Sequence, residues 1–141
     1  MQYESRFTVK ECHLDTMGHM NNAQYLIAFE QARWDWATSV GMGFDKIRSI
    51  GIGFVVLELK IRFSRELRLR EEVVIKTDFQ TYNRKIGEIK QEMNSLRGEL
   101  CCRADIKVGL MDLKKRELIP PTDEFIAAFN LEKLRQPIEK S

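Results

Sequence analysis

The strongest structural signal in this chain is the stretch NAQYLIAFEQARWDWATSV at residues 22–40. Its apolar side chains recur at steps of three and four, which places them on one face of an α-helix. Further apolar residues widen this stripe until little of the helix is left for water, so we expect a core helix wrapped by a sheet. The stripe consists of Tyr25, Phe29, Ala32, Trp36 and Val40, widened by Leu26, Ile27, Trp34 and Ala37.

The sequence also indicates where this helix begins and ends. Asn21 or Asn22 is a suitable N-cap, because a short amide side chain can accept a hydrogen bond from the first free backbone N–H groups. Gly41 stands where a helix commonly ends in a left-handed residue. We therefore predict a helix from Asn22 to Val40.

The remaining apolar residues alternate with polar ones, the pattern of half-buried strands. In residues 53–64 the alternation predicts that Val55, Leu57, Leu59, Ile61 and Phe63 share one face. Gly98 marks a hairpin turn, and Thr122 is the expected cap of a short closing helix with apolar residues turned inward. The expected strands are residues 5–13, 53–64, 72–82, 85–96 and 100–111.

One long apolar helix among five strands predicts an α+β fold, in which a five-stranded antiparallel sheet curls around the helix. No repeat or Pro/Gly/Ser-rich linker divides residues 1–141, so we expect a single domain.

Composition excludes several classes of protein. With 23 basic and 21 acidic residues the net charge is +2, far from the basic excess of a nucleic-acid-binding protein. No apolar run is long enough to cross a membrane, and no signal-peptide core is present. Cys12, Cys101 and Cys102 have neither metal-ligand nor disulfide-framework spacing, so we expect a soluble cytoplasmic protein with reduced thiols and no metal.

The segment LDTMGHMNNAQY, residues 14–25, combines the groups that acyl chemistry needs. The free backbone N–H groups at a helix start can polarise a carbonyl oxygen, helped by the helix dipole. Gly18 permits a tight turn, and Asp15 can serve as a general base or as a nucleophile.

The pattern D-x-x-G-H-M-N-N-A-x-Y at residues 15–25 resembles the signature of 4-hydroxybenzoyl-CoA thioesterase-like proteins of the hotdog superfamily. It also resembles the D-x-x-x-H-x-N-N pattern of acyl-carrier-protein thioesterases. The resemblance extends over the chain through residues 29–33, Gly41, residues 82–85 and Pro120-Pro121.

This resemblance implies a single hotdog domain that hydrolyses acyl-thioesters to a carboxylic acid and a thiol. It assigns the catalytic aspartate to Asp15 and the oxyanion donor to the backbone N–H of Asn22, and it implicates His19 and Asn21 in catalysis. Gly18 and Tyr25 belong to the same motif as substrate-binding positions. Arg84 and Lys85 match basic residues that hold coenzyme A phosphates.

The resemblance further implies a homodimer, or a tetramer formed by two dimers, with sites between subunits. The substrate is an acyl-CoA or an acyl-carrier protein, and no cofactor is implied beyond the coenzyme A or phosphopantetheine of that substrate.

Several alternatives stay open. Asp15 has a simpler role as a turn residue, His19 as a structural hydrogen bonder, and Arg84 with Lys85 as a solvated strand end. A related hydratase motif, D-x-N-P-x-H, has a proline and a longer spacing that this chain lacks. A domain that binds acyl-thioesters without cleaving them is the other alternative, and neither a nucleophilic nor a general-base route for Asp15 is singled out by the sequence.

Overall fold

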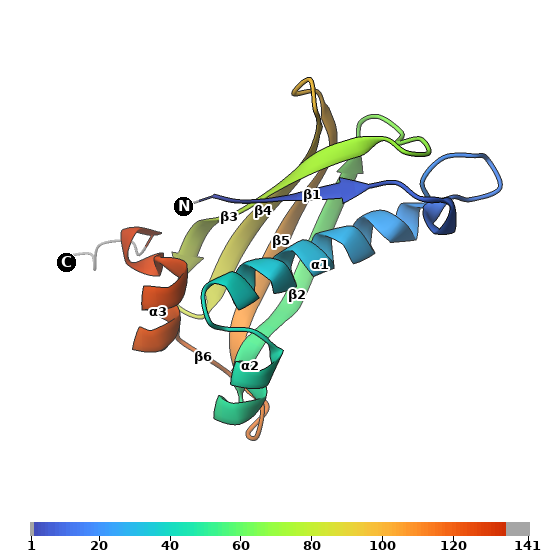
Figure 1. Cartoon of the computed structure of the whole chain (residues 1–141). Helices are drawn as coiled ribbons and strands as arrows, with labels where there is room; N and C mark the ends of the chain where they lie inside the picture. The colour runs from blue at the N-terminus through green and yellow to red at the C-terminus, as the bar shows by residue number, and fades with distance from the viewer. Residues whose placement is uncertain (1, 135–141) are drawn as a thin grey trace.

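The computed structural model describes residues 2–134. A long helix, a short helix and a run of long strands follow one another, with a second short helix near the end (Figure 1). In chain order the elements are β1 (Tyr3–Thr8), the 3₁₀ turn η1 (Glu11–His13), α1 (Asn22–Ser39), α2 (Phe44–Ile50), β2 (Ile52–Phe63), β3 (Glu72–Asn83), β4 (Ile86–Ser95), β5 (Leu100–Asp112), β6 (Glu117–Ile119), α3 (Asp123–Phe129) and the 3₁₀ turn η2 (Leu131–Leu134).

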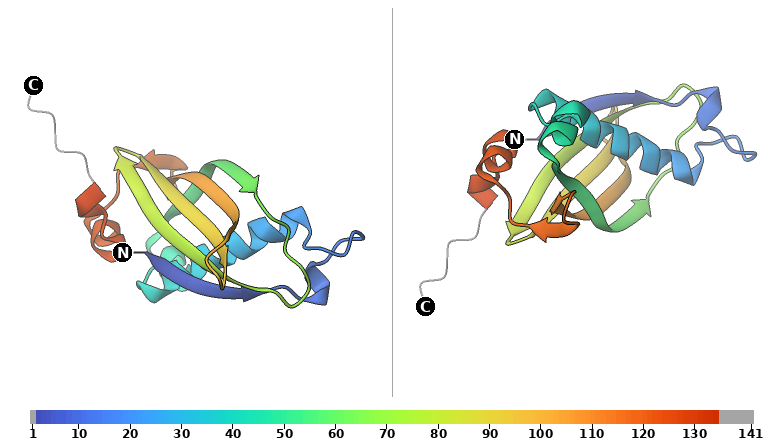
Figure 2. Two further views of the ribbon diagram at one scale, coloured as in Figure 1. Left: turned by 90° about the horizontal axis from the view of Figure 1, so that it is seen from above. Right: turned by 90° about the horizontal axis from the view of Figure 1, so that it is seen from below.

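The five long strands form an antiparallel sheet in the order β1-β3-β4-β5-β2, and the short β6 pairs with β5. The sheet curves around α1, which lies against its concave face (Figures 1 and 2). This confirms the predicted sheet and central helix. β6, which the sequence did not predict, comes from three residues after the turn that follows β5.

α1 is held in place by apolar contacts with the sheet. Tyr25, Phe29, Ala32 and Trp36 of the predicted stripe are buried, and Phe29 is fully inaccessible. The prediction that the whole helix is enclosed is wrong for the single chain, because Ile27 is 56% exposed. Leu26 and Trp34 are also exposed, so the sheet covers most of the stripe and leaves three of the four flanking residues uncovered.

A buried polar cluster joins α1 to the middle of the sheet. The side-chain amide of Gln91 on β4 donates to the carbonyl of Phe29 at 2.9 Å and to the hydroxyl of Thr77 on β3 at 3.0 Å. Its oxygen accepts a hydrogen bond of 2.8 Å from Arg33 Nη1. Because Gln91 and Thr77 are fully inaccessible, these bonds are needed to offset the cost of burying their polar atoms.

The predicted helix ends are confirmed. Asn21 is the N-cap, and its Oδ1 accepts a hydrogen bond from the Ala23 N–H at 2.8 Å. Gly41 has a φ of +82°, a left-handed conformation that suits a residue without a Cβ. The closing helix α3 is capped by Thr122, whose hydroxyl accepts from the Phe125 N–H at 3.3 Å. Phe125, Ile126 and Phe129 are buried as predicted.

Two strand predictions differ from the structure. The first strand ends at Thr8 and not at residue 13, because the chain turns into η1 before residues 14–25. In β2 a bulge between Val56 and Glu58 shifts the register with β5. Residues that pair across two strands share a face of the sheet. Phe54 pairs with Leu110 and Val56 with Val108, and both partners are buried, so Phe54 and Val56 lie on the concave face. The sequence pattern predicts Val55 and Leu57 there instead.

Replacing Phe29 by Ala should lower the free energy of unfolding by about 3–5 kcal/mol, because it leaves a cavity under the middle of α1. Ile27→Ala is the matched control on the same helix, and its exposed side chain should contribute less than about 0.5 kcal/mol. Urea denaturation followed by circular dichroism measures both values. Equal losses in the two variants would contradict the packing described here.

Candidate active site

The segment between η1 and α1 is a closed loop. The Asp15 N–H donates to the His19 carbonyl at 3.0 Å, and the Gly18 N–H donates to the Asp15 carbonyl at 3.2 Å. Gly18 turns the chain with a φ of +84°, a conformation that a side chain would strain. The loop is anchored to the rest of the fold by the Met20 N–H, which donates to the Leu67 carbonyl at 2.9 Å.

One oxygen of the Asp15 carboxylate is held by a hydrogen bond, and the other faces His19. Oδ1 accepts the Met17 N–H at 2.8 Å, the aspartate turn that the simpler interpretation of this residue expects. Oδ2 lies 3.6 Å from His19 Nδ1. The side chain of Asp15 is 24% exposed, so the turn leaves this carboxylate reachable from solvent.

α1 begins directly after the loop with N–H groups that have no helical partner. Asn21 uses its side chain to cap Ala23, while Asn22 is the first helical residue and is exposed. No hydrogen bond from the Asn22 N–H is found within residues 2–134. A negatively charged oxygen placed here would gain from this N–H and from the positive end of the helix dipole.

His19 contacts a second carboxylate that sequence reasoning missed. Its Nε2 lies 3.5 Å from Glu66 Oε2, and its backbone forms a bridge with Arg68. Glu66 belongs to the β2–β3 connection, far from the loop in sequence. No spacing rule links the two positions, so only the packing of that connection against the loop reveals the Asp15–His19–Glu66 arrangement.

Tyr25, in the first turn of α1, contacts the connection that carries Glu66. Its side chain is 2% exposed, and its hydroxyl accepts the Leu67 N–H at 3.2 Å. Burial raises the pKa of Tyr25 above its ordinary value. These contacts tie α1 to the connection that carries Glu66. A direct contact of Tyr25 with substrate stays a prediction.

Arg84 and Lys85 lie in the β3–β4 turn, at the end of the sheet opposite the Asp15 loop (Figures 1 and 2). The loop adjoins the start of β3, where Thr8 pairs with Glu72. β3 then runs for 12 residues, which puts its two ends about 36 Å apart at ~3.3 Å per residue. Within one chain the structure therefore does not bring the two basic residues to Asp15. They line a surface depression that also includes Lys107.

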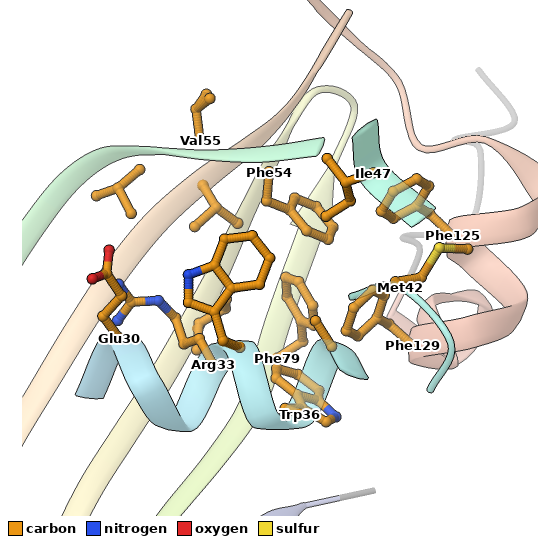
Figure 3. A pocket seen from close by; sticks show the side chains of 15 residues that line it. Glu30, Arg33, Trp36, Met42, Ile47, Phe54, Val55, Phe79, Phe125 and Phe129 are labelled. Carbon is orange, nitrogen blue, oxygen red and sulfur yellow. The ribbon is translucent and has the colours of Figure 1, made fainter. Parts of the chain in front are cut away.

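A cavity of about 140 Å³ lies between the second half of α1 and β2 (Figure 3). Its walls are mainly aromatic and aliphatic, and the helices α2 and α3 close one end. Phe44 of α2, whose side chain is exposed, does not line it. The lining includes Trp34, Trp36, Phe54, Phe79, Phe125 and Phe129.

Within residues 2–134 no group of three or more His, Cys, Asp or Glu side chains is arranged to hold a metal ion. None of the helices described there is long and apolar enough to cross a membrane.

Comparison with known proteins places this geometry in a family. Residues 9–129 match the model of the thioesterase-like superfamily. The long-chain acyl-CoA thioesterase FadM of Escherichia coli is 30% identical over 117 residues, which cover 82% of this chain and 88% of FadM.

Two solved structures extend the comparison. The probable thioesterase YbaW of Escherichia coli is 28% identical with a TM-score of 0.78, covering 93% of this chain and 97% of YbaW. The Synechocystis 1,4-dihydroxy-2-naphthoyl-CoA thioesterase Slr0204 has a TM-score of 0.84 over 97% of this chain and 100% of its own. At 16% identity it supports the fold alone. The chain belongs to the thioesterase-like superfamily of hotdog proteins, and its enzyme class is that of the thioester hydrolases.

Proposed function

We propose that this protein hydrolyses long-chain acyl-thioesters at the junction of the Asp15 loop and the start of α1. The observation that carries the proposal is the oriented, accessible Asp15 carboxylate, held in the loop that leads directly into the exposed helix start. The thioester carbonyl oxygen would rest on the Asn22 N–H, where the helix dipole stabilises the charge of a tetrahedral intermediate.

Two routes fit the position of Asp15. As a general base, the carboxylate takes a proton from water while the water oxygen bonds to the carbonyl carbon. Collapse of the intermediate then breaks the C–S bond and releases a thiolate, which takes up a proton. As a nucleophile, the carboxylate attacks the carbon directly, releases the thiolate and leaves an anhydride that water cleaves.

His19 and Glu66 support Asp15 in this proposal. A neutral imidazole has only one N–H to donate, whereas the protonated ring has one for each carboxylate. A ring held between Asp15 and Glu66 can therefore fix the unoccupied Oδ2 of Asp15. The separations of 3.6 and 3.5 Å are longer than hydrogen bonds, as is common before substrate tightens a site.

The cavity beside α1 supports long acyl groups. Its lining on α1 begins at Glu30, eight residues beyond Asn22, which is about 12 Å along the helix at ~1.5 Å per residue. Partly exposed apolar residues on the concave face of β2, Val56 and Phe63 among them, flank the interval between the helix start and the cavity. Short acyl groups would end before they reached it. The name of the relative FadM, a long-chain acyl-CoA thioesterase, agrees with this length.

The proposed assembly is a homodimer, or a tetramer formed by two such dimers, that binds acyl-CoA or acyl-carrier protein in the cytoplasm. β2 is an edge strand, so one row of its backbone groups has no strand partner within residues 2–134. Leu57 is 44% exposed near the middle of this strand. Because Arg84 and Lys85 lie a sheet length from Asp15 in the same chain, another copy would have to supply them to the phosphates of that substrate.

The first test is release of free thiol from acyl-CoAs of increasing chain length. We expect turnover to rise toward long chains, and Asp15→Asn to reduce kcat by about 100-fold or more. Asparagine keeps an oxygen for the Met17 N–H, so the loop should stay folded. Asp35→Asn, another exposed carboxylate that bonds within α1, is the control and should keep full activity. An Asp15→Asn variant as active as the control would remove Asp15 from the mechanism. Binding without thiol release would favour the non-catalytic alternative.

A second test addresses Glu66. Glu66→Gln should lower kcat by about tenfold and leave KM unchanged. This loss corresponds to a coupling energy of about 1.4 kcal/mol between Glu66 and His19. In a His19→Asn background the same substitution should then have no further effect. Glu124→Gln removes a similarly exposed glutamate that pairs with Lys46 at 2.9 Å, and serves as the control. Equal losses in both backgrounds would show that Glu66 acts independently of His19.

A third test addresses the dimer. Leu57→Lys would place like charges close together if two β2 strands pair around a two-fold axis, so the variant should dissociate into 16.6 kDa monomers. Leu96→Lys, at an exposed leucine in the β4–β5 turn, should leave the assembly unchanged. Sedimentation velocity distinguishes the species. A wild-type protein that sediments as a monomer at micromolar concentration would exclude this dimer.

A further inference from the structure

The cavity beside α1 has one polar end. Among the described residues that line it, Glu30 and Arg33 are the charged ones, and both lie at the end nearer the start of α1 (Figure 3). The opposite end is formed by Ile47, Phe125 and Phe129. A ligand entering from the helix start would pass the two charged groups before it reached the apolar end.

The guanidinium of Arg33 is held in a fixed place. Nη1 donates to Gln91 Oε1 at 2.8 Å, and Gln91 is itself fixed by the Phe29 carbonyl and the Thr77 hydroxyl. Burial lowers the pKa of Arg33 and the charge of Glu30 partly opposes that shift. An arginine nevertheless stays protonated in proteins, so a cation faces this cavity.

Arg33 has more donors than the protein uses. Of its five N–H groups, the one toward Gln91 makes the only hydrogen bond that Arg33 forms within residues 2–134. No carboxylate oxygen of those residues, that of Glu30 included, lies within 4.0 Å of an Arg33 nitrogen, which is the limit for an ion pair. A neutral donor could satisfy Gln91 without the cost of desolvating a charge. The remaining donors are not among the buried, unpartnered atoms, so they are open to water or to an acceptor on a bound ligand.

Glu30 narrows the chemistry of that acceptor. It lies three residues before Arg33, a spacing that puts both on the same side of α1. Together they offer N–H donors and a carboxylate acceptor at one end of an apolar cavity. A carboxylate on the acyl chain would be repelled by Glu30, and a plain alkyl chain would displace water from the Arg33 donors without replacing its hydrogen bonds. A hydroxyl group both accepts and donates, so it matches the pair.

Resting on the proposed thioesterase function, we infer that the Glu30–Arg33 pair recognises a hydroxyl group within a long acyl chain, which makes hydroxylated acyl-thioesters the preferred substrates. The hydroxyl lies far from the thioester. Glu30 and Arg33 are eight and eleven residues beyond Asn22, or about 12–16 Å along the helix. An extended alkyl chain advances about 1.25 Å per methylene with C–C bonds of about 1.5 Å, so the hydroxyl falls roughly ten to thirteen carbons from the carbonyl.

The apolar end of the cavity then takes the rest of the chain. The whole cavity, its charged end included, has a volume of about 140 Å³, close to that of an engineered cavity of about 150 Å³ that binds benzene, a ligand of six carbons. A tail of similar size beyond the hydroxyl fits this space. 12-Hydroxyoctadecanoyl-CoA, with six carbons beyond its hydroxyl carbon, is therefore the probe.

The experiment compares kcat/KM for 12-hydroxyoctadecanoyl-CoA with that for octadecanoyl-CoA, and for 3-hydroxyoctadecanoyl-CoA as a positional control. The wild type should prefer the 12-hydroxy substrate by about tenfold, the value of one hydrogen bond to a charged group, and should show no preference for the 3-hydroxy substrate. Glu30→Gln and Arg33→Lys should bring the 12-hydroxy preference close to one. Asp35→Asn, on the same helix and outside the cavity, should preserve it.

For each variant, kcat/KM for octadecanoyl-CoA is the reference against which its 12-hydroxy preference is expressed, so a general loss of activity does not count as a loss of preference. Because Arg33→Lys disturbs the bond to Gln91, its unfolding free energy is measured alongside, and Glu30→Gln keeps the test decisive if that variant fails to fold. A wild-type preference of one or below would overturn the inference. The inference would also be overturned if the Glu30→Gln variant, and the Arg33→Lys variant where it folds, kept the preference for the 12-hydroxy substrate.

Binding of the free acids separates this inference from the thioesterase function. Calorimetry with 12-hydroxyoctadecanoic and octadecanoic acids needs no turnover, and the hydroxy acid should bind about tenfold more tightly. Tighter binding without thiol release from any thioester would count against hydrolysis and support the hydroxyl site. Hydrolysis with equal binding of the two acids would support the enzyme and refute the site.

Discussion

The structure depends on the burial of α1. The helix carries more apolar surface than a flat sheet could cover, so the sheet curves around it and places Phe29 and Trp36 in the core. Asn22 and Ala23 at its start are nevertheless exposed, although the loop before them is anchored in the core through Met20, whose N–H bonds to the Leu67 carbonyl. The same helix therefore supplies the hydrophobic centre of the protein and an exposed set of N–H groups at one end.

Polar contacts fix this helix against the sheet along its length. At the start, the Tyr25 hydroxyl and the Met20 N–H bind the backbone of Leu67. In the middle, Gln91 bonds to the helix carbonyl of Phe29 and to Arg33. Hydrophobic contacts alone would let the helix slide or rotate on the apolar sheet, whereas these directional bonds set its register. The positions of both the Asp15 loop and the cavity follow from that register.

The Asp15 loop and the cavity have different parts in the proposed reaction. Asp15, His19 and the Asn22 N–H lie where the backbone is irregular and partly hydrated, as the chemistry of a carbonyl group requires. The aromatic cavity lies where the regular elements pack, as an alkyl chain requires. Because α1 runs from the Asp15 loop to the cavity, the distance along this helix indicates how long an acyl chain must be to reach the cavity from the reacting carbonyl.

The sequence by itself determined the helix, the five long strands, the caps at Asn21 and Thr122, and the loop residues around Asp15, because these depend on local periodicity and on backbone preferences of single residues. Only the tertiary structure decided the bulge in β2, which moves Phe54 and Val56 to the concave face, since a bulge arises from pairing with β5. It alone placed Glu66 beside His19 and left Arg33 facing the cavity. It alone separated Arg84 and Lys85 from Asp15 by the length of the sheet. Contacts between residues distant in the chain depend on how the sheet curves around the helix, and no local pattern in a single sequence records that curvature.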